Sequence, residues 1–324
     1  MVVPCTLSSK NESAMQSRRT FLKQAAIGSG LLLAGAFPFG SLAAAPRRKL
    51  VILHTNDVHS RLDPFPDDGG KYAGQGGVAA RAALIRQIRE QEEHVLLLDA
   101  GDIFQGTPYF NIFKGEPEIK AMSMMGYDAV TMGNHDFDAG LEGFARQLVH
   151  ASFRVLTANY DFTGTVLEGR TQPYMVVTKG GLRIGIFGLG IRLDGLVPPD
   201  AYAGMRYLEP VPVARAVSEQ LKKQERCDMV ICLSHLGYDY PYQRVSDRIL
   251  AAETEYIDLI IGGHTHTFLD QPVSVRNKNG GEVAISQVGW GGLRLGRLDY
   301  VFDSKKSSKR VKAQSVIVGK QTRG

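Results

Sequence analysis

Metal-binding side chains gather in five short segments of this chain. Each segment contains a histidine, an aspartate or an asparagine, and five of the eight histidines of the sequence lie in them. The segments are Asp57-Val58-His59, Gly101-Asp102, Gly133-Asn134-His135-Asp136-Phe137-Asp138, Ser234-His235 and Gly262-Gly263-His264-Thr265-His266. A single histidine after a strand is more often structural than a ligand, but five such segments together indicate a functional site. Imidazole, carboxylate and amide groups without a thiolate suit zinc, manganese or iron.

The number of these side chains favours two metal ions over one. A four-coordinate ion cannot use all of them, whereas two ions about 3.5–4 Å apart that share a bridging carboxylate can. Such a pair generates a nucleophilic hydroxide near neutral pH and neutralises charge on a phosphoryl oxygen. The residue types therefore predict a dinuclear hydrolytic site.

Each segment follows a short apolar run that is typical of a buried strand. The runs cover residues 50–53, 95–98, 129–130, 229–233 and 259–261. Continuous apolar runs favour strands that are buried on both faces, and sites in open α/β sheets form beyond the carboxyl ends of strands. We therefore expect the five segments to meet at one edge.

Helical patterns alternate with these runs, which indicates an α/β protein. They cover residues 78–92, 141–151, 210–225 and 241–252. Further strands are expected at residues 173–178, 182–189, 272–275, 283–288 and 295–302. A core of two sheets with helices outside fits this order, and no domain boundary is evident.

The motifs resemble those of the calcineurin-like metallophosphoesterases, and more closely those of the 5′-nucleotidase family. The closer similarity rests on Thr55-Asn56-Asp57-Val58-His59 and on the segment from Gly133 to Asp138. The order and spacing of all five segments match, and the resemblance extends from about residue 50 to residue 300. It implies a four-layer α/β/β/α sandwich with two mixed sheets.

The resemblance also implies a role for each polar residue. The implied ligands are Asp57, His59 and His266 for a first metal and Asn134, His235 and His264 for a second, with Asp102 as a bridge. His135 is implied to contact the phosphate and to stabilise or protonate the leaving group, while Asp138 orients its ring. The implied reaction is in-line attack of a metal-bridging hydroxide on a phosphate monoester, with 5′-nucleotides as the expected substrates and two zinc, manganese or iron ions as cofactors.

Three other residues near these motifs invite interpretation. Asp136 is expected to be structural, as a cap of the following helix. His54 precedes the first motif inside a strand and is expected to be structural as well. Trp290, in Val288-Gly289-Trp290-Gly291-Gly292, either lines the substrate cleft or packs in a turn.

The sequence departs from the longer members of the 5′-nucleotidase family at its carboxyl end. Those proteins carry a second domain that binds the nucleoside, whereas this chain stops at Gly324. We expect ester cleavage to be retained and a separate polypeptide to supply nucleoside recognition. The alternatives are a 2′,3′-cyclic nucleotide phosphodiesterase, a nucleotide-sugar hydrolase or a thiohydrolase of the same superfamily. A non-catalytic metal-binding subunit is a remote alternative, because both His135 and Asp138 are present.

Residues 1–45 resemble a twin-arginine export signal. Ser17-Arg18-Arg19-Thr20-Phe21-Leu22-Lys23 precedes an apolar stretch at residues 25–39, and Ala43-Ala44-Ala45 offers a cleavage site. An uncleaved anchor is the alternative, but the stretch is shorter than the roughly 20 residues of a membrane span. We therefore expect a metallophosphoesterase catalytic domain of residues 46–324 that is periplasmic or exported by the twin-arginine pathway, with membrane contact only during export.

Charge and cysteine content limit the remaining functions. Removal of residues 1–45 takes away four basic residues and one acidic residue, so the formal net charge falls from +5 to +2. Much of that excess lies in the tail, at Lys305, Lys306, Lys309, Arg310 and Lys312, and a run of this kind is usually a solvated face. Nucleic acid is therefore not an expected partner. Neither Cys227 nor Cys232 is expected to bind metal.

Overall fold

The computed structural model describes residues 48–303 and 309–319. The predicted export signal at residues 1–45 lies outside the described residues, as do Lys305 and Lys306 of the basic tail. In the part of the chain that is described, no helix is both long enough and apolar enough to cross a membrane.

The first sheet is mixed and carries three of the predicted site segments. Its strand order is β14-β13-β1-β2-β3-β4. The strands are β1 (Arg48–Thr55), β2 (Val95–Asp99), β3 (Ala129–Val130), β4 (Arg154–Val155), β13 (Arg294–Phe302) and β14 (Lys309–Ile317). Strands β1 to β4 run parallel, whereas β13 pairs antiparallel with both β1 and β14. The carboxyl ends of β1, β2 and β3 therefore lie next to one another.

The second sheet is also mixed and carries the other two segments. Its order is β11-β12-β10-β9-β7-β6. The strands are β6 (Tyr174–Lys179), β7 (Leu182–Leu189), β9 (Met229–Ser234), β10 (Leu259–Gly262), β11 (Val273–Arg276) and β12 (Glu282–Ser286). Strands β7, β9, β10 and β12 run parallel, and the two outer strands are antiparallel. A small ribbon of β5 (Tyr160–Asp161) and β8 (Arg206–Tyr207) lies apart from both sheets.

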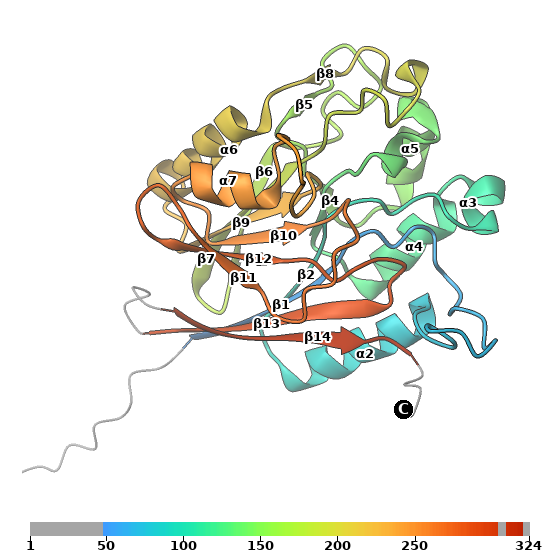
Figure 1. Cartoon of the computed structure of the whole chain (residues 1–324), viewed down its shortest axis with the longest axis horizontal. Coiled ribbons are helices and arrows are strands. Elements are labelled where there is room, and N and C mark those ends of the chain that lie inside the picture. The colour runs from blue at the N-terminus through green and yellow to red at the C-terminus, as the bar shows by residue number, and fades with distance from the viewer. Residues whose placement is uncertain (1–47, 304–308, 320–324) are drawn as a thin grey trace, which may run out of the picture. The chain divides into compact units, whose positions relative to one another are not determined.

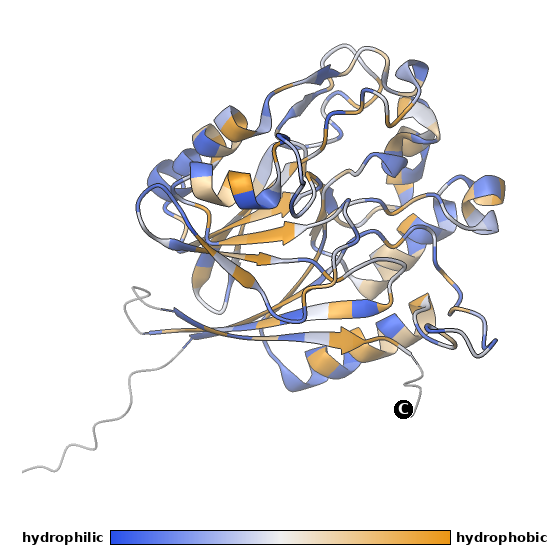
Figure 2. Ribbon diagram, viewed as in Figure 1, coloured by the Kyte–Doolittle hydropathy of each residue, from blue (hydrophilic) through white to orange (hydrophobic). Residues whose placement is uncertain are grey.

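An apolar layer fills the space between the two large sheets. Leu50 and Ile52 of β1 pack in this layer with Ile184 of β7. Val51 and Leu53 belong instead to the core on the opposite face of the first sheet, because successive side chains of a strand point to opposite faces. Figure 2 shows the strands as mainly hydrophobic, in keeping with sheets that are covered on both faces.

Helices cover the outer face of each sheet and complete four layers. The apolar core outside the first sheet receives side chains from α2 (Val78–Gln91), α4 (Glu116–Met125) and α5 (Gly140–Gln147). The core outside the second sheet receives them from α6 (Pro210–Glu219) and α7 (Asp247–Glu253). Figure 1 shows this arrangement, with the two sheets between the helical layers. The predicted α/β/β/α sandwich with two mixed sheets is confirmed.

Local structure differs from the expectation at four places. Helix α7 begins at Asp247 rather than at residue 241, because Ser246 caps it and accepts a hydrogen bond from Ile249 N. Helix α6 ends at Glu219 and continues as a π-helical turn over Gln220–Gln224. Helices α3 (Pro108–Phe113) and α4 were not expected. The basic tail was expected to be only a solvated run, but part of it forms β14, an edge strand.

Candidate metal centre

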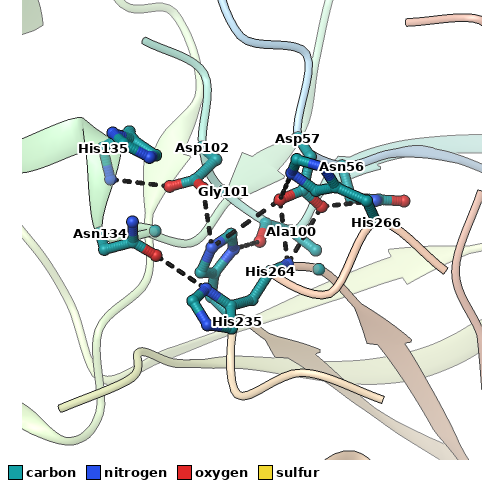
Figure 3. Close-up of polar contacts among 12 residues, drawn as sticks. Asn56, Asp57, Ala100, Gly101, Asp102, Asn134, His135, His235, His264 and His266 are labelled. Atoms are coloured by element: carbon teal, nitrogen blue, oxygen red, sulfur yellow. Dashed lines mark hydrogen bonds and ion pairs between the residues drawn. The ribbon is translucent and has the colours of Figure 1, made fainter. Parts of the chain in front are cut away.

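The five predicted segments come together beyond the carboxyl ends of β1, β2, β3, β9 and β10 (Figure 3). Their backbone is unusual, because Asp57, His59, Asp102, His264 and His266 have φ between 50° and 72°. A left-handed conformation is costly for residues other than glycine and persists only where the surrounding structure enforces it. Strain of this kind clusters at functional sites, so its presence at five candidate ligands supports the assignment of this edge as a site.

A first group of possible metal ligands comprises Asp57, His59 and His266, whose ligand atoms lie within 4.8 Å of one another. The Nε2 atoms of His59 and His266 are 2.9 Å apart, and His266 Nε2 lies 3.4 Å from Asp57 Oδ1. His59 Nδ1 donates to the carbonyl oxygen of Phe104 at 3.3 Å, so its Nε2 faces His266 without a proton. Burial also lowers the pKa of His59, which favours the neutral imidazole that metal binding requires.

A second group comprises Asp102, His235 and His264, again with ligand atoms within 4.8 Å of one another. Asn134 joins it, since its Oδ1 lies 2.8 Å from His264 Nδ1. His235 Nδ1 donates to the carbonyl oxygen of Ala100 at 2.6 Å and so directs Nε2 toward Asp102 (Figure 3). Burial lowers the pKa of His264 to about 4. His264 therefore offers a neutral imidazole, beside the carboxylate of Asp102 and the amide oxygen of Asn134.

Asp102 lies between the two groups. Its Oδ2 is 3.2 Å from His235 Nε2 of the second group and 3.8 Å from His59 Nε2 of the first. Its Oδ1 accepts a hydrogen bond from the backbone N–H of His135 at 2.8 Å. This position is the one that a bridging carboxylate requires.

The chemistry of these donors fits divalent metal ions. His235 Nε2 is buried and has no well-aligned hydrogen bond within the described residues. Burial opposes a charge on His235, yet the carboxylates of Asp102 and Asp57 raise its pKa to about 10. The buried carboxylates therefore attract positive charge. Divalent cations would compensate the charges of Asp57 and Asp102 and would give His235 Nε2 a partner. Without such partners, burial of these charged and polar groups is costly.

His135 and Asp138 lie together beside the first group. His135 Nδ1 donates to Asp138 Oδ2 at 2.9 Å, which leaves Nε2 as the other polar atom of the ring. This hydrogen bond is the main reason why the pKa of His135 is raised. The His135 side chain is 32% exposed, and its ring centroid lies 5.3 Å from that of His59. His135 therefore sits at an accessible position next to the candidate ligands.

Asp136 is structural, but it does not cap the following helix as expected. Its side chain is fully buried, and its carboxylate accepts hydrogen bonds from four backbone N–H groups. These belong to Asp102 at 3.0 Å, Ile103 at 2.9 Å, Phe104 at 3.2 Å and Gly133 at 2.8 Å. The carboxylate thus ties the loop after β2 to the loop after β3. The sequence did not reveal this role because it depends on contacts with a loop more than 30 residues away.

Glycine is required at Gly133 by the closeness of these loops. A Cβ atom there would lie 2.2 Å from Asp102 Oδ1 and 2.6 Å from a carbon of the His235 ring. Both are below any real contact distance, and both side chains are held in place. The glycine of this motif therefore allows the two loops to approach.

Two further residues support the site, and neither was assigned a role from the sequence. Asn56 donates to Asp57 Oδ2 and to Gly289 O, both at 2.6 Å, and accepts from Val288 N. Gln287 donates to Gly263 O at 2.8 Å and accepts from the backbone N–H of Thr267. Both amides lie next to motif residues in space, but their partners are 20 or more residues away in sequence, apart from Asp57.

His54, Trp290 and the two cysteines lie in three different environments. His54 is buried in a structural position, with Nε2 3.0 Å from Ser286 Oγ. The Trp290 ring stacks on the ring of His266 with centroids 5.9 Å apart and an angle of 14°. Trp290 therefore lies at the site, against a candidate ligand. Cys227 and Cys232 are free, buried, and absent from both ligand groups.

Comparison with known proteins agrees with this geometry. Residues 50–268 match the model of the family described as calcineurin-like phosphoesterase. Snake venom 5′-nucleotidase from Gloydius brevicauda is 35% identical over 90% of this chain and 52% of its own length. The 5′-nucleotidase of Bos taurus is 33% identical over 81% of this chain and 48% of its own length.

A solved structure shows the same relation. The 5′-nucleotidase precursor from Thermus thermophilus superposes with a TM-score of 0.75 and 33% identity, over 84% of this chain and 55% of that one. The chain thus spans about half the length of the relatives it matches. The family match covers the candidate ligands themselves, and on this evidence the chain belongs to the calcineurin-like phosphoesterase family.

Proposed function

We propose that this protein is an exported dinuclear metallophosphoesterase that hydrolyses phosphate monoesters, with 5′-nucleotides as its substrates. The observation that supports this most directly is the pair of ligand groups with the Asp102 carboxylate between them. Asp57, His59 and His266 would hold one ion, Asn134, His235 and His264 the other, and Asp102 both. When bound, the two cations supply Lewis acidity and activate water near neutral pH. The choice among zinc, manganese and iron belongs to the same proposal.

The residues of the chain supply positioning and proton transfer. Asp138 fixes the tautomer of His135 by accepting from Nδ1, and thereby directs Nε2 toward a phosphate bound on the ligand groups. A His135 imidazolium would donate its Nε2 proton to the departing alcohol, while the P–O bond to that alcohol breaks and water supplies the new P–O bond. A raised pKa of His135 favours this protonated form.

Nucleoside recognition and location form the less direct part of the proposal. The relatives are 5′-nucleotidases of about twice the length, which supports a nucleoside-binding part outside the region that matches. We propose that a separate polypeptide supplies it and that the twin-arginine signal directs the protein to the periplasm. A pull-down from the native host that recovers only this chain, with full nucleotidase activity, would contradict the partner.

A substrate panel with metal analysis tests the catalytic proposal. The metal-loaded chain should contain two divalent ions and hydrolyse 5′-nucleotides faster than cyclic nucleotides, nucleotide sugars or thiosulfate esters. The variant His135→Ala should lower kcat by roughly 10²–10⁴ with unchanged metal content. Loss of metal in that variant would show that His135 is a ligand, and absence of any hydrolysis by the loaded wild type would indicate a non-catalytic metal-binding subunit.

A further inference from the structure

Helix α7 begins with an aspartate that lies against the loops of the second ligand group and takes no part in the proposed chemistry. The side chain of Asp247 is fully buried. Its Oδ1 accepts a hydrogen bond from Ser234 Oγ at 2.5 Å, and its backbone N–H donates to Gly237 O at 2.8 Å. Ser234 is the last residue of β9 and directly precedes His235. Asp247 therefore contacts the chain on both sides of a candidate ligand.

The hydroxyl group of Ser234 carries this contact to His235. It donates to Asp247 and accepts from the backbone N–H of Leu236 at 3.3 Å. A hydroxyl group that has its proton fixed on one partner has its lone pairs directed toward the other. His235 stands between Ser234 and Leu236, so the acceptor at position 247 helps to define the turn that holds the imidazole.

The other carboxyl oxygen of Asp247 packs against the strand that leads to His264. A Cβ atom on Gly262, the last residue of β10, would lie 2.2 Å from Asp247 Oδ2. A Cβ atom on Gly263 would lie 2.7 Å from His235 Nδ1, and His264 follows directly. One side chain therefore contacts the ends of both strands that carry the histidines of the second group.

The carboxyl group of Asp247 can serve in this place without a charge. Its Oδ2 is buried and has no hydrogen-bond partner within the described residues. Burial raises the pKa of Asp247 to about 8, so near neutral pH the group is largely protonated. A neutral carboxyl group still accepts from Ser234, and the amide of an asparagine has a similar shape and an acceptor oxygen. Asp247→Asn is therefore a conservative change, whereas Asp247→Ala removes the acceptor.

We propose that Asp247 is a positioning residue for the second ligand group, which fixes the ends of β9 and β10 so that His235 and His264 bind the same ion. The inference rests on the proposed function, since it assumes that this group holds a metal ion. Residues that orient metal ligands without binding the metal typically contribute about 10–100-fold to metal affinity. The loss of the acceptor should therefore be visible in metal binding as well as in stability.

Cobalt titration of the metal-free protein, followed by visible absorption, tests the proposal with Asp258→Ala as the matched control. Asp258 joins the same two strands at their amino ends, because its Oδ2 accepts from Val230 N at 2.8 Å and its backbone N–H donates to Val230 O at 2.9 Å. Asp247→Ala should weaken the binding of one of the two ions about 10–100-fold and leave the other unchanged. Asp247→Asn should restore most of that affinity, and Asp258→Ala should affect neither ion.

Ser234→Ala removes the same hydrogen bond from its other end. It should weaken the binding of the same ion, and it decides the proposal if Asp247→Ala does not fold. Unchanged affinity for both ions in Ser234→Ala would overturn the positioning role. A loss of affinity in Asp247→Asn as large as in Asp247→Ala would overturn it as well, because the asparagine keeps an acceptor for the hydroxyl group.

A measurement without metal separates this proposal from the proposed function. The ring N–H of His235 that donates to Ala100 O at 2.6 Å should give a downfield proton resonance that is absent from His235→Gln. This resonance should shift or vanish in Asp247→Ala and remain in Asp247→Asn and Asp258→Ala. If wild type binds no metal, the proposed function fails, and the resonance still decides: an unchanged position in Asp247→Ala refutes the positioning role.

Discussion

Asp136 and Asp138 lie two residues apart, but their side chains have different partners in the structure and therefore different roles. The same change, aspartate to asparagine, should therefore lower stability at one position and catalysis at the other. Asp136→Asn replaces a carboxylate that accepts four backbone N–H groups, two on each oxygen. Asp138→Asn replaces a partly exposed carboxylate that accepts a hydrogen bond from the ring of His135.

The size of the first effect follows from counting hydrogen bonds. An asparagine amide retains one acceptor oxygen and turns its NH₂ group toward the other two N–H donors, so two of the four bonds are lost. Hydrogen bonds to charged groups contribute about 1.5–3 kcal/mol each, so the free energy of unfolding should fall by about 3 kcal/mol or more. For a domain of this size that lowers Tm by about 6–12 °C.

Thermal unfolding and steady-state kinetics on both variants distinguish the structural role of Asp136 from the role of Asp138 in catalysis. Asp136→Asn should show the lowered Tm, together with weaker metal binding, because the carboxylate positions the backbone of Asp102. Asp138→Asn should keep the Tm and metal content of wild type but have a lower kcat, because the ring of His135 is no longer oriented and its pKa is no longer raised by Asp138. A wild-type Tm for Asp136→Asn would show that the variant does not lose two stabilising hydrogen bonds. An equal fall in Tm for both variants would show that Asp138 contributes to stability as much as Asp136 does.

Three further predictions concern single residues. The variant His266→Ala should bind one metal ion per chain instead of two, as measured by elemental analysis; loss of both would mean that the two groups are not separable. Zinc added to the metal-free protein should change the emission of Trp290, the single tryptophan, because its ring stacks on His266; an unchanged spectrum at full occupancy would contradict this contact. Burial lowers the pKa of His54 to about 3, so between that value and the unfolded value of about 6.5 only the unfolded chain binds the proton, and stability falls as pH drops. In urea unfolding from pH 7 to pH 5, the free energy of unfolding of His54→Asn should fall by up to about 1.4 kcal/mol less per pH unit than that of wild type. If the free energies of unfolding of the two proteins fall in parallel with pH, His54 does not contribute.

The elements that carry the candidate ligands could be predicted from the sequence. An apolar run such as residues 229–233 indicates a buried strand, and the polar residue that follows it must then lie at the carboxyl end of a sheet. This local rule placed His235 and the residues that follow β10 at one edge. The boundaries of helices depended on details that the pattern does not contain, such as the Ser246 cap that starts α7 six residues later than expected.

Contacts between distant segments could not be predicted in this way. Asn56 is held by backbone atoms of Val288 and Gly289, 232 and 233 residues away. The partners of such an amide become visible only when β1 and the loop before β13 are placed together. Residues that act on a neighbouring side chain were therefore recognisable from the motif, whereas residues that act through the backbone of another loop were not.

Asp136 and Asp138 show this difference within one motif. The double variant Asp136→Asn/Asp138→Asn tests whether the two residues act independently. Asp138 contacts a side chain three residues away, so its partner can be read from the motif; Asp136 contacts the loop after β2. If Asp136 acts on the backbone of Asp102 and Asp138 only on the ring of His135, then Asp136→Asn/Asp138→Asn should have the Tm of the first single variant. Its loss of transition-state stabilisation should equal the sum of the two single losses, since independent sites add within about 0.3–0.5 kcal/mol. A larger departure from additivity would mean that the tie between the loops also sets the position of His135, and that the backbone N–H of His135 on Asp102 couples the two roles.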